Sequence, residues 1–216
     1  MLTAIDRYAS HIKSQDIVYI GEFGCNNGSQ TIELKNHFIN STILCAEPDP
    51  KLAAHCHALF NNNKHILFNE CAIGLATPDK QTITFNQSNS NNNGIGSLFK
   101  PNGQFPLESM PTSEINVPYR RLDTVMEANK VPHLDLMWLD CQGGELELLK
   151  SMGDKLNDTK VIWTEFFIKP IYEGAPVLSD LDYYLINYNF NRVFTDEWCS
   201  GWFGDALYIK QQKPLQ

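Results

Sequence analysis

The sequence predicts an α/β fold with a mainly parallel central sheet, helices on both faces and an antiparallel strand pair near the C-terminus. Two observations carry this prediction. Short apolar runs rich in β-branched residues alternate with segments whose apolar residues recur at helical spacing. Strands that are linked through helices pair in parallel. In contrast, the extended runs at 190–195 and 206–210 are joined only by an aromatic loop, which favours two closing antiparallel strands.

The individual elements follow from the same patterns. We expect core strands at 17–20, 42–47, 65–68, 134–139 and 161–164, and a strand in an edge hairpin at 81–86. We expect helices at 2–13, 29–35, 50–60, 124–129 and 178–188, with one more after Glu145, and Asp123 as the N-cap of the helix at 124–129.

Residues 88–116 differ from the rest of the chain because they are rich in Asn, Ser, Gly and Pro. A stretch of this length without periodic structure is either a linker or a functional lid. Periodic structure continues on both sides, so we predict a lid within one domain that spans residues 1–216. The glycine-containing run 94–99 is the part that we expect to close over a ligand.

Composition excludes several classes of partner. The chain has 216 residues, 43% hydrophobic, and a net charge of −8 with no Lys/Arg cluster, so nucleic acid is not an expected partner. No apolar run reaches the length of a membrane span and no leader is visible, so we expect no membrane partner and a cytoplasmic location. The six cysteines form no C-x-x-C pair, which favours reduced thiols over disulfides or a zinc site.

The turn after the first strand points to a nucleotide-like ligand. It reads Glu22-Phe23-Gly24-Cys25-Asn26-Asn27-Gly28, whereas a dinucleotide site has G-x-G-x-x-G to grip a pyrophosphate. The glycines allow close approach of a ligand to the backbone, and the carboxylate suits an ammonium or sulfonium charge. Glu47, at the tip of the second strand, can accept both hydroxyls of a ribose. Together these features favour S-adenosylmethionine over NAD.

Acidic residues lie at the ends of four predicted strands: Glu22, Glu47, Asp140 and Glu165. In an open α/β sheet, ligands bind at the carboxyl ends of the strands, so these acids should lie close to a ligand. The alternative is that each acid stabilises the N-terminus of the following helix.

The motifs resemble those of the FkbM family of S-adenosylmethionine-dependent methyltransferases. The family has an acid-x-Gly-Ala-Asn-x-Gly turn, a Glu-Pro-x-Pro strand end, an Ala-Ile-Gly loop, a Leu-Asp pair and a Lys-x-Asp-x-Glu-Gly-x-Glu signature. The corresponding segments here are 22–28, 47–50, 72–74, 122–123 and 138–145, in the family's order.

The resemblance implies a Rossmann-like class I methyltransferase fold and an S-adenosylmethionine-dependent O-methyltransferase acting on a hydroxyl of a saccharide or other small metabolite. Its implied cofactor-binding residues are Glu22, Gly24, Asn26, Gly28, Glu47, Cys71, Ala72 and Asp140. Its implied catalytic residues are Asp140, Glu165 and Glu145. As in catechol O-methyltransferases, Asp140 and Glu165 could share a divalent cation such as Mg²⁺ that lowers a hydroxyl pKa; alternatively, Asp140 is itself the base.

Two positions depart from the family signature. Trp138 replaces the usual lysine and Gln142 replaces the usual glutamate. These replacements keep open a non-catalytic ligand-binding module with the methyltransferase fold. An NAD-dependent oxidoreductase is a further alternative, for which the Glu22 turn has the wrong shape.

The remaining candidates are single residues. His55 and His57 lie two apart on a helix and His133 precedes a strand, so we interpret all three as solvated or structural rather than metal ligands. Trp198, Trp202 and Phe203 either stack on an acceptor or cover the core. Lys169 and Tyr172 are candidate acceptor contacts.

Overall fold

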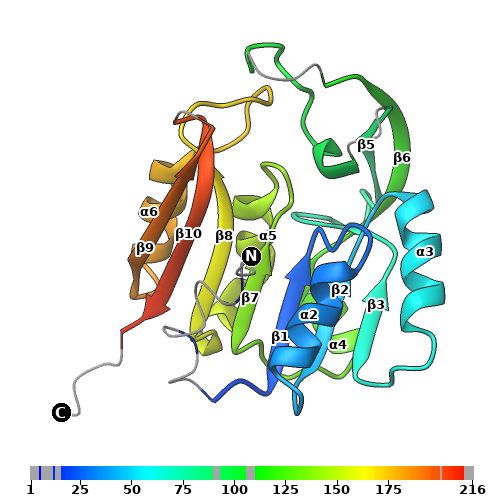
Figure 1. Cartoon of the computed structure of the whole chain (residues 1–216), viewed down its shortest axis with the longest axis vertical. Coiled ribbons are helices and arrows are strands. Elements are labelled where there is room, and N and C mark those ends of the chain that lie inside the picture. Colours follow the sequence, from blue (N-terminus) through cyan, green and yellow to red (C-terminus); the bar gives the residue numbers. More distant parts are fainter. Residues whose placement is uncertain are drawn as a thin grey trace.

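A computed structural model describes residues 5, 12, 16–89, 93–105, 110–199 and 201–211 (Figure 1). The predicted helix at 2–13 lies outside these residues except for Ile5 and Ile12, which are helical and buried. Within the described part of the chain, no helix is long and apolar enough to cross a membrane.

The central sheet has seven strands in the order β3-β2-β1-β7-β8-β10-β9. They are β1 (Tyr19–Phe23), β2 (Thr42–Ala46), β3 (Ile66–Asn69), β7 (Leu136–Leu139), β8 (Val161–Phe167), β9 (Phe190–Trp198) and β10 (Phe203–Lys210). The first five pair in parallel, and β10 is antiparallel to both β8 and β9. The predicted mainly parallel sheet with a closing antiparallel pair is therefore confirmed.

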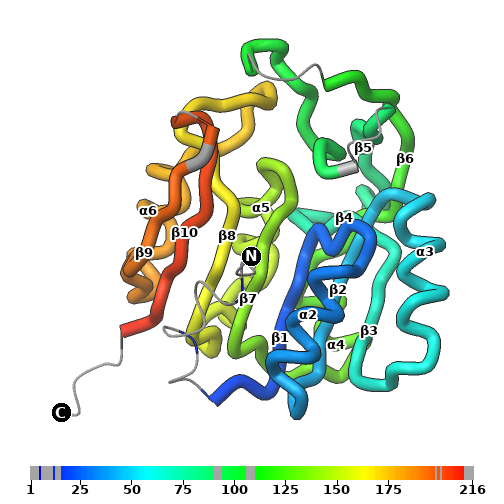
Figure 2. The backbone as a smooth tube through the Cα atoms, in the orientation of Figure 1, coloured from blue at the N-terminus to red at the C-terminus, as the bar shows by residue number. Residues whose placement is uncertain are grey.

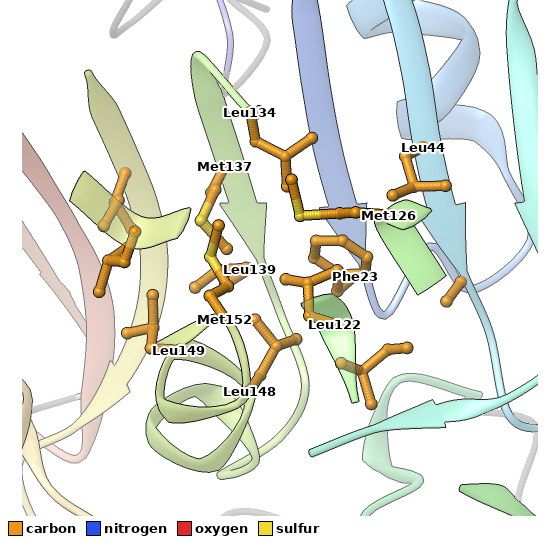
Figure 3. Close-up of a cluster of buried hydrophobic side chains, with 14 of the residues drawn as sticks. Phe23, Leu44, Leu122, Met126, Leu134, Met137, Leu139, Leu148, Leu149 and Met152 are labelled. Atoms are coloured by element: carbon orange, nitrogen blue, oxygen red, sulfur yellow. The ribbon is translucent and has the colours of Figure 1, made fainter. Parts of the chain in front are cut away.

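Helices cover both faces of this sheet. One face packs against α2 (Ser29–His37), α3 (Pro50–Phe60) and the side chains of Ile5 and Ile12. The other packs against α4 (Leu122–Ala128), α5 (Glu145–Ser151) and α6 (Leu178–Ile186), with a 3₁₀ turn η2 (Gly153–Asp158) after α5. Figure 3 shows the second core, in which Phe23 of β1 and Met137 of β7 meet the leucines and methionines of α4 and α5.

A second, three-stranded sheet has the order β4-β6-β5. Its strands are β4 (Ala72–Ile73), β5 (Thr82–Ser88) and β6 (Thr112–Arg120), and the 3₁₀ turn η1 (Asn93–Ile95) follows β5. The backbone trace in Figure 2 runs through these elements near the end of the central sheet where the parallel strands terminate. This second sheet therefore lies where ligands bind in α/β folds.

Several element ends differ from the prediction. β1 begins two residues and ends three residues later than the predicted strand, so Glu22 and Phe23 belong to the strand and not to the turn. β8 continues through Glu165 to Phe167. α4 begins at Leu122 with Arg121 as its N-cap; Asp123 is not the cap but accepts the backbone N–H of Thr124 from the first turn. Each difference arises where a sheet partner or a local contact extends an element beyond its own sequence pattern.

Candidate active site

A cleft of about 690 Å³, open at its mouth, lies at the carboxyl ends of β1, β2 and β7. Six of the predicted cofactor-binding residues line it: Gly24, Asn26, Glu47, Cys71, Ala72 and Asp140. Phe85 of β5 and Leu98 add apolar surface from the second sheet and the predicted lid. The strand ends therefore bring these six residues together as the sequence predicted.

Glu47 follows β2 directly, and its carboxylate is held by the backbone of two neighbouring turns. Oε2 accepts the N–H of Asn26 at 2.9 Å and Oε1 accepts the N–H of Asp49 at 2.9 Å. Burial raises the pKa of Glu47 to about 7. Each carboxylate oxygen keeps a second lone pair for a donor in the cleft, so the side chain can receive two hydroxyl groups.

The glycine turn is shaped as much by packing as by a ligand. Gly24 has φ +82°, and a Cβ on it would lie 1.8 Å from the carbonyl oxygen of Asp140. Gly28 caps α2 with φ +75°, and a Cβ there would meet the ring of Phe60 at 2.5 Å. Gly24 lines the cleft and Gly28 does not. The predicted role of Gly28 in close approach to a ligand is therefore replaced by a role in packing α2 against α3.

Glu22 is not among the residues that line the cleft, in contrast to its predicted contact with the cofactor. Because β1 extends through Phe23, side-chain alternation turns Phe23 toward the cleft and Glu22 toward the opposite face, which α2 covers. Glu22 is 1% exposed, and its nearest polar side chain is Thr31 of α2, whose hydroxyl opposes the rise in the pKa of Glu22. Burial, with a smaller contribution from the charge of Asp140, raises its pKa to about 8.

Because Glu22 is buried, its ionisation lowers the free energy of unfolding, and this effect depends on pH. The folded-state pKa of about 8 exceeds the ordinary value of 4.5, so the folded protein binds the extra proton and stability falls as pH rises between these values. Glu22→Gln cannot ionise, so we expect it to be more stable than the parent by about 4 to 5 kcal/mol at pH 8.5 and by less than about 1 kcal/mol at pH 5. Urea unfolding at both pH values measures this difference.

The matched control for Glu22→Gln is Glu127→Gln, whose parent side chain is 71% exposed and should leave stability unchanged at both pH values. A Glu22→Gln variant that is equally destabilised at pH 5 and pH 8.5 would contradict the expected ionisation.

Asp140, directly after β7, lies close to Glu165, within the neighbouring strand β8, and the side-chain amide of Gln142 bridges them. Gln142 Nε2 donates to Asp140 Oδ1 at 2.8 Å and to Glu165 Oε2 at 2.6 Å. The Tyr172 hydroxyl donates to Gln142 Oε1 at 2.8 Å, which fixes the amide orientation. The backbone of Gln142 is left-handed, with φ +51°, and this turn directs its side chain back over the two acids.

Burial raises the pKa of both acids, and the interaction between the two carboxyl groups moves their pKa values apart. The pKa of Glu165 is raised well above 4.5 by burial and then by the charges of Asp140, Glu145 and Asp205. Burial also raises the pKa of Asp140, while the hydrogen bond from Gln142 opposes that rise. The pair therefore holds a proton on Glu165 and leaves Asp140 as the more readily ionised member.

The same geometry does not favour the predicted cation. Both carboxylates point to one place, but the NH₂ group of Gln142 occupies it and presents hydrogens rather than lone pairs. Among the residues that the structure describes, no group of three or more His, Cys, Asp and Glu side chains is arranged to hold a metal ion. We therefore derive no chemical step through a metal.

Glu145, the third predicted catalytic acid, lies at the start of α5 and is buried. Its Oε1 accepts the backbone N–H groups of Cys141 and Gly143, at 2.7 and 3.3 Å. Burial raises its pKa to about 7. It lines neither the cleft nor the neighbouring pocket, so the structure places it as a support for the loop 140–144.

Trp138, which replaces the family's usual lysine, belongs to the core. Its ring stacks on that of Trp163 with centroids 4.0 Å apart and an interplanar angle of 14°. Both indoles pack on the face of the sheet that α2 covers, and neither lines the cleft. The replacement therefore changes packing and removes no group from the site.

The other predicted residues are distributed as follows. His57 lies at the surface 3.3 Å from Glu70, and His133 lies 3.3 Å from Asp135 near the start of β7. Lys169 packs over the ring of Trp202, with Nζ 5.1 Å from its centroid. His55 is exposed on α3, while the side chain of Trp198 lies outside the described residues.

The predicted lid reaches the site at two places. Gly94, Gly96 and Leu98 line the cleft, and Ser97 Oγ donates to the backbone oxygen of Gln142 at 2.7 Å. Further along, Asn102 N–H donates to the carbonyl oxygen of Ile171 at 3.0 Å, which joins the lid to the segment between β8 and α6.

A second pocket, of about 440 Å³ with its open mouth, adjoins the cleft, since Gly94 and Gln142 line both. Phe203, from the predicted aromatic cluster, lines it together with Glu165. Sequence reasoning did not find this pocket or the bridging role of Gln142. The departure of Gln142 from the family signature was the sequence feature that marked this position as unusual.

Comparison with known proteins identifies the family. The methyltransferase FkbM domain matches residues 22–192, more than half of the chain. The chain belongs to the FkbM methyltransferase family. Methyl transfer is therefore the class of reaction that this FkbM site serves.

A curated relative and two solved structures extend the comparison. The FkbM-family chain is 28% identical over 169 residues to the 2-O-methyltransferase NoeI of Sinorhizobium fredii (strain NBRC 101917 / NGR234), covering 74% of this chain and 68% of that protein. TrmK of M. capricolum, in complex with S-adenosyl-homocysteine, gives a TM-score of 0.53 at 11% identity, with 98% and 70% coverage of the two chains. The magnesium protoporphyrin IX methyltransferase ChlM from Synechocystis PCC 6803, with bound SAM, gives a TM-score of 0.50 at 10% identity, with 96% and 76% coverage. These likenesses confirm the predicted class I methyltransferase fold.

Proposed function

We propose that this FkbM-family protein is an S-adenosylmethionine-dependent O-methyltransferase that acts on a hydroxyl of a saccharide or other small metabolite. The observation that carries the proposal is the position of the Asp140–Gln142–Glu165 group between the cleft and the second pocket. A general base at such a junction can reach an acceptor on one side and a methyl donor on the other.

The cleft fits S-adenosylmethionine through its donor and acceptor groups. Glu47 offers two carboxylate oxygens to the ribose hydroxyls, while Cys71 and Ala72 supply apolar surface for the adenine. Two methyltransferases of the same fold, TrmK and ChlM, were solved with S-adenosyl-homocysteine and SAM respectively. We assign the cofactor roles to Gly24, Asn26, Glu47, Cys71 and Ala72.

The proposed chemistry requires a base rather than a nucleophilic side chain. S-adenosylmethionine supplies a methyl group whose C–S bond breaks with its electron pair staying on sulfur, as the acceptor oxygen forms the new C–O bond. The carboxylate of Asp140 receives the acceptor's hydroxyl proton. Glu165, already protonated, limits the negative charge at the site, and Gln142 holds both carboxyl groups in register.

Support for an oxygen acceptor comes from the name of NoeI, a 2-O-methyltransferase, together with the carboxyl pair. The retained pair also weighs against a non-catalytic module, because Gln142 completes a hydrogen-bonded network instead of breaking one. An NAD-dependent oxidoreductase is disfavoured because the turn after β1 lacks the pyrophosphate-binding pattern.

The proposal is tested by incubating the protein with S-adenosylmethionine and a panel of hydroxylated acceptors, including mono- and oligosaccharides. Mass spectrometry should detect an added methyl group on the acceptor, with S-adenosylhomocysteine formed in equal amount. Cofactor binding without any product from the panel would favour the non-catalytic module, and NADH binding without S-adenosylhomocysteine binding would favour the oxidoreductase.

Glu47→Ala should weaken the binding of S-adenosylhomocysteine at least tenfold, because two charge-assisted hydrogen bonds contribute about 1.5 kcal/mol or more each. Isothermal titration calorimetry measures the dissociation constant. Glu70→Ala is the matched control, since Glu70 follows the neighbouring strand but is exposed and does not line the cleft. Unchanged affinity in Glu47→Ala would remove Glu47 from the cofactor site.

A further inference from the structure

The second pocket has a chemical character that restricts what can enter it. Its walls are apolar and come from separate segments of the chain: Ile95, Phe105, Met110, Phe167, Ile171 and Phe203. Phe167 and Ile171 are each less than 5% exposed, so these walls are formed by the fold itself.

The polar groups of this pocket are acidic or neutral. Among its described lining residues, Gln142 and Glu165 carry polar side chains, and no lysine, arginine or histidine is present. Asp205 of β10 is the register partner of Glu165 and adds to the negative potential on it. An anionic group entering here would approach the carboxylates of Asp140 and Asp205, and the described lining residues offer no cation to offset these charges.

The pocket also has a defined relation to the reacting centre. It shares Gly94 and Gln142 with the cleft, and Glu165 on its floor is joined through the Gln142 amide to Asp140 in the cleft. A group seated between the aromatic walls therefore lies beside the proposed base.

From these observations we propose that the second pocket is the acceptor subsite, and that it selects an uncharged acceptor with a ring or hydrocarbon face beside the reacting hydroxyl, rejecting acceptors with a phosphate or carboxylate near that hydroxyl. This inference rests on the proposed O-methyltransferase function and specifies its substrate class. Phe203 and Phe105 supply stacking surface, and Glu165 with Gln142 supplies the polar floor.

The natural acceptor is not needed for the test, because pairs of small compounds that differ only in charge report the preference of the pocket. Hydroxyl-bearing ring compounds and their carboxylate counterparts, for example phenyl β-glucoside and phenyl β-glucuronide, are screened by ligand-detected NMR against protein saturated with S-adenosylhomocysteine. We expect the uncharged members to bind at least fivefold more tightly than their carboxylate counterparts. Phe203→Ala and the milder Phe203→Leu should weaken the uncharged members, whereas Tyr183→Ala, at a 79% exposed position on α6, should not.

A charge-introducing variant makes the test decisive. Met110→Lys places an ammonium group at the partly buried wall with a side chain of similar length, and we expect it to improve binding of the carboxylate fragments at least tenfold. Three results would overturn the inference. The parent protein could bind the carboxylate members more tightly, neither series could bind, or both Phe203 variants could bind the uncharged members as tightly as the parent does. Unfolding midpoints confirm that each variant is folded.

The outcomes separate this inference from the proposed function. Absence of S-adenosylhomocysteine binding in the parent protein would overturn the proposed function. The fragment preferences would then still decide whether the second pocket prefers uncharged ligands. Methylation of an anionic acceptor at a hydroxyl next to its charge would leave the proposed function standing and overturn the acceptor class.

Discussion

Asp140→Asn should lower kcat on the order of 10³-fold, while the dissociation constant of S-adenosylhomocysteine changes by about threefold or less. Asparagine keeps the shape of the side chain and can still form a hydrogen bond with Gln142, but it cannot accept the acceptor's proton. Steady-state kinetics and calorimetry measure the two effects on the same preparation. Loss of cofactor binding instead would make Asp140 a cofactor residue, and unchanged kcat would move the base to Glu165.

Substitution of Gln142 tests the same base, Asp140, by a second measurement. The hydrogen bond from Gln142 opposes the rise in the pKa of Asp140, so Gln142→Ala should shift the acidic limb of the pH–activity profile, where Asp140 ionises, to higher pH. A purely structural role for Gln142 would lower activity equally at all pH values. The pH profile of kcat/KM therefore distinguishes a positioning residue from a packing residue.

Gly24→Ala should destabilise the protein by about 4 kcal/mol or more, because the left-handed φ of +82° and a Cβ only 1.8 Å from the Asp140 carbonyl oxygen must both be relieved by backbone movement. Gly103→Ala is the matched control: its φ is +72°, but nothing lies within 4 Å of a Cβ there, so about 1 kcal/mol is expected. Urea unfolding measures both. Equal destabilisation by the two substitutions would show that the backbone conformation, and not the contact with Asp140, sets the requirement for glycine at position 24.

The sequence predicted the sheet, its helices and most of the cleft because these depend on local patterns. Glu47 is an example: a β-branched run ends at it, and the geometry of parallel sheets then brings it to the ligand edge. Glu22 was misplaced for a physical reason of the same kind. Side chains alternate along a strand, so three additional residues at the end of β1 were enough to turn it away from the cleft.

The second pocket and the bridging amide could not be predicted in this way. The pocket walls come from segments as distant as Ile95 and Phe203, and no periodic pattern links them. Gln142 acts through a left-handed backbone conformation that glutamine rarely adopts, which a propensity argument does not anticipate.

The stacked indoles of Trp138 and Trp163 have a consequence for the carboxyl groups of Asp140 and Glu165. The two tryptophans are register partners on adjacent strands, and Asp140 and Glu165 each follow their tryptophan by two residues, which is one pleat further along the same face. The backbone hydrogen bonds set the spacing of β7 and β8, and the stacked rings pack the sheet one pleat before the two acids, which restricts the movement of the strand segments that carry them. Trp138, at the position of the family's usual lysine, therefore supports the carboxyl pair through packing.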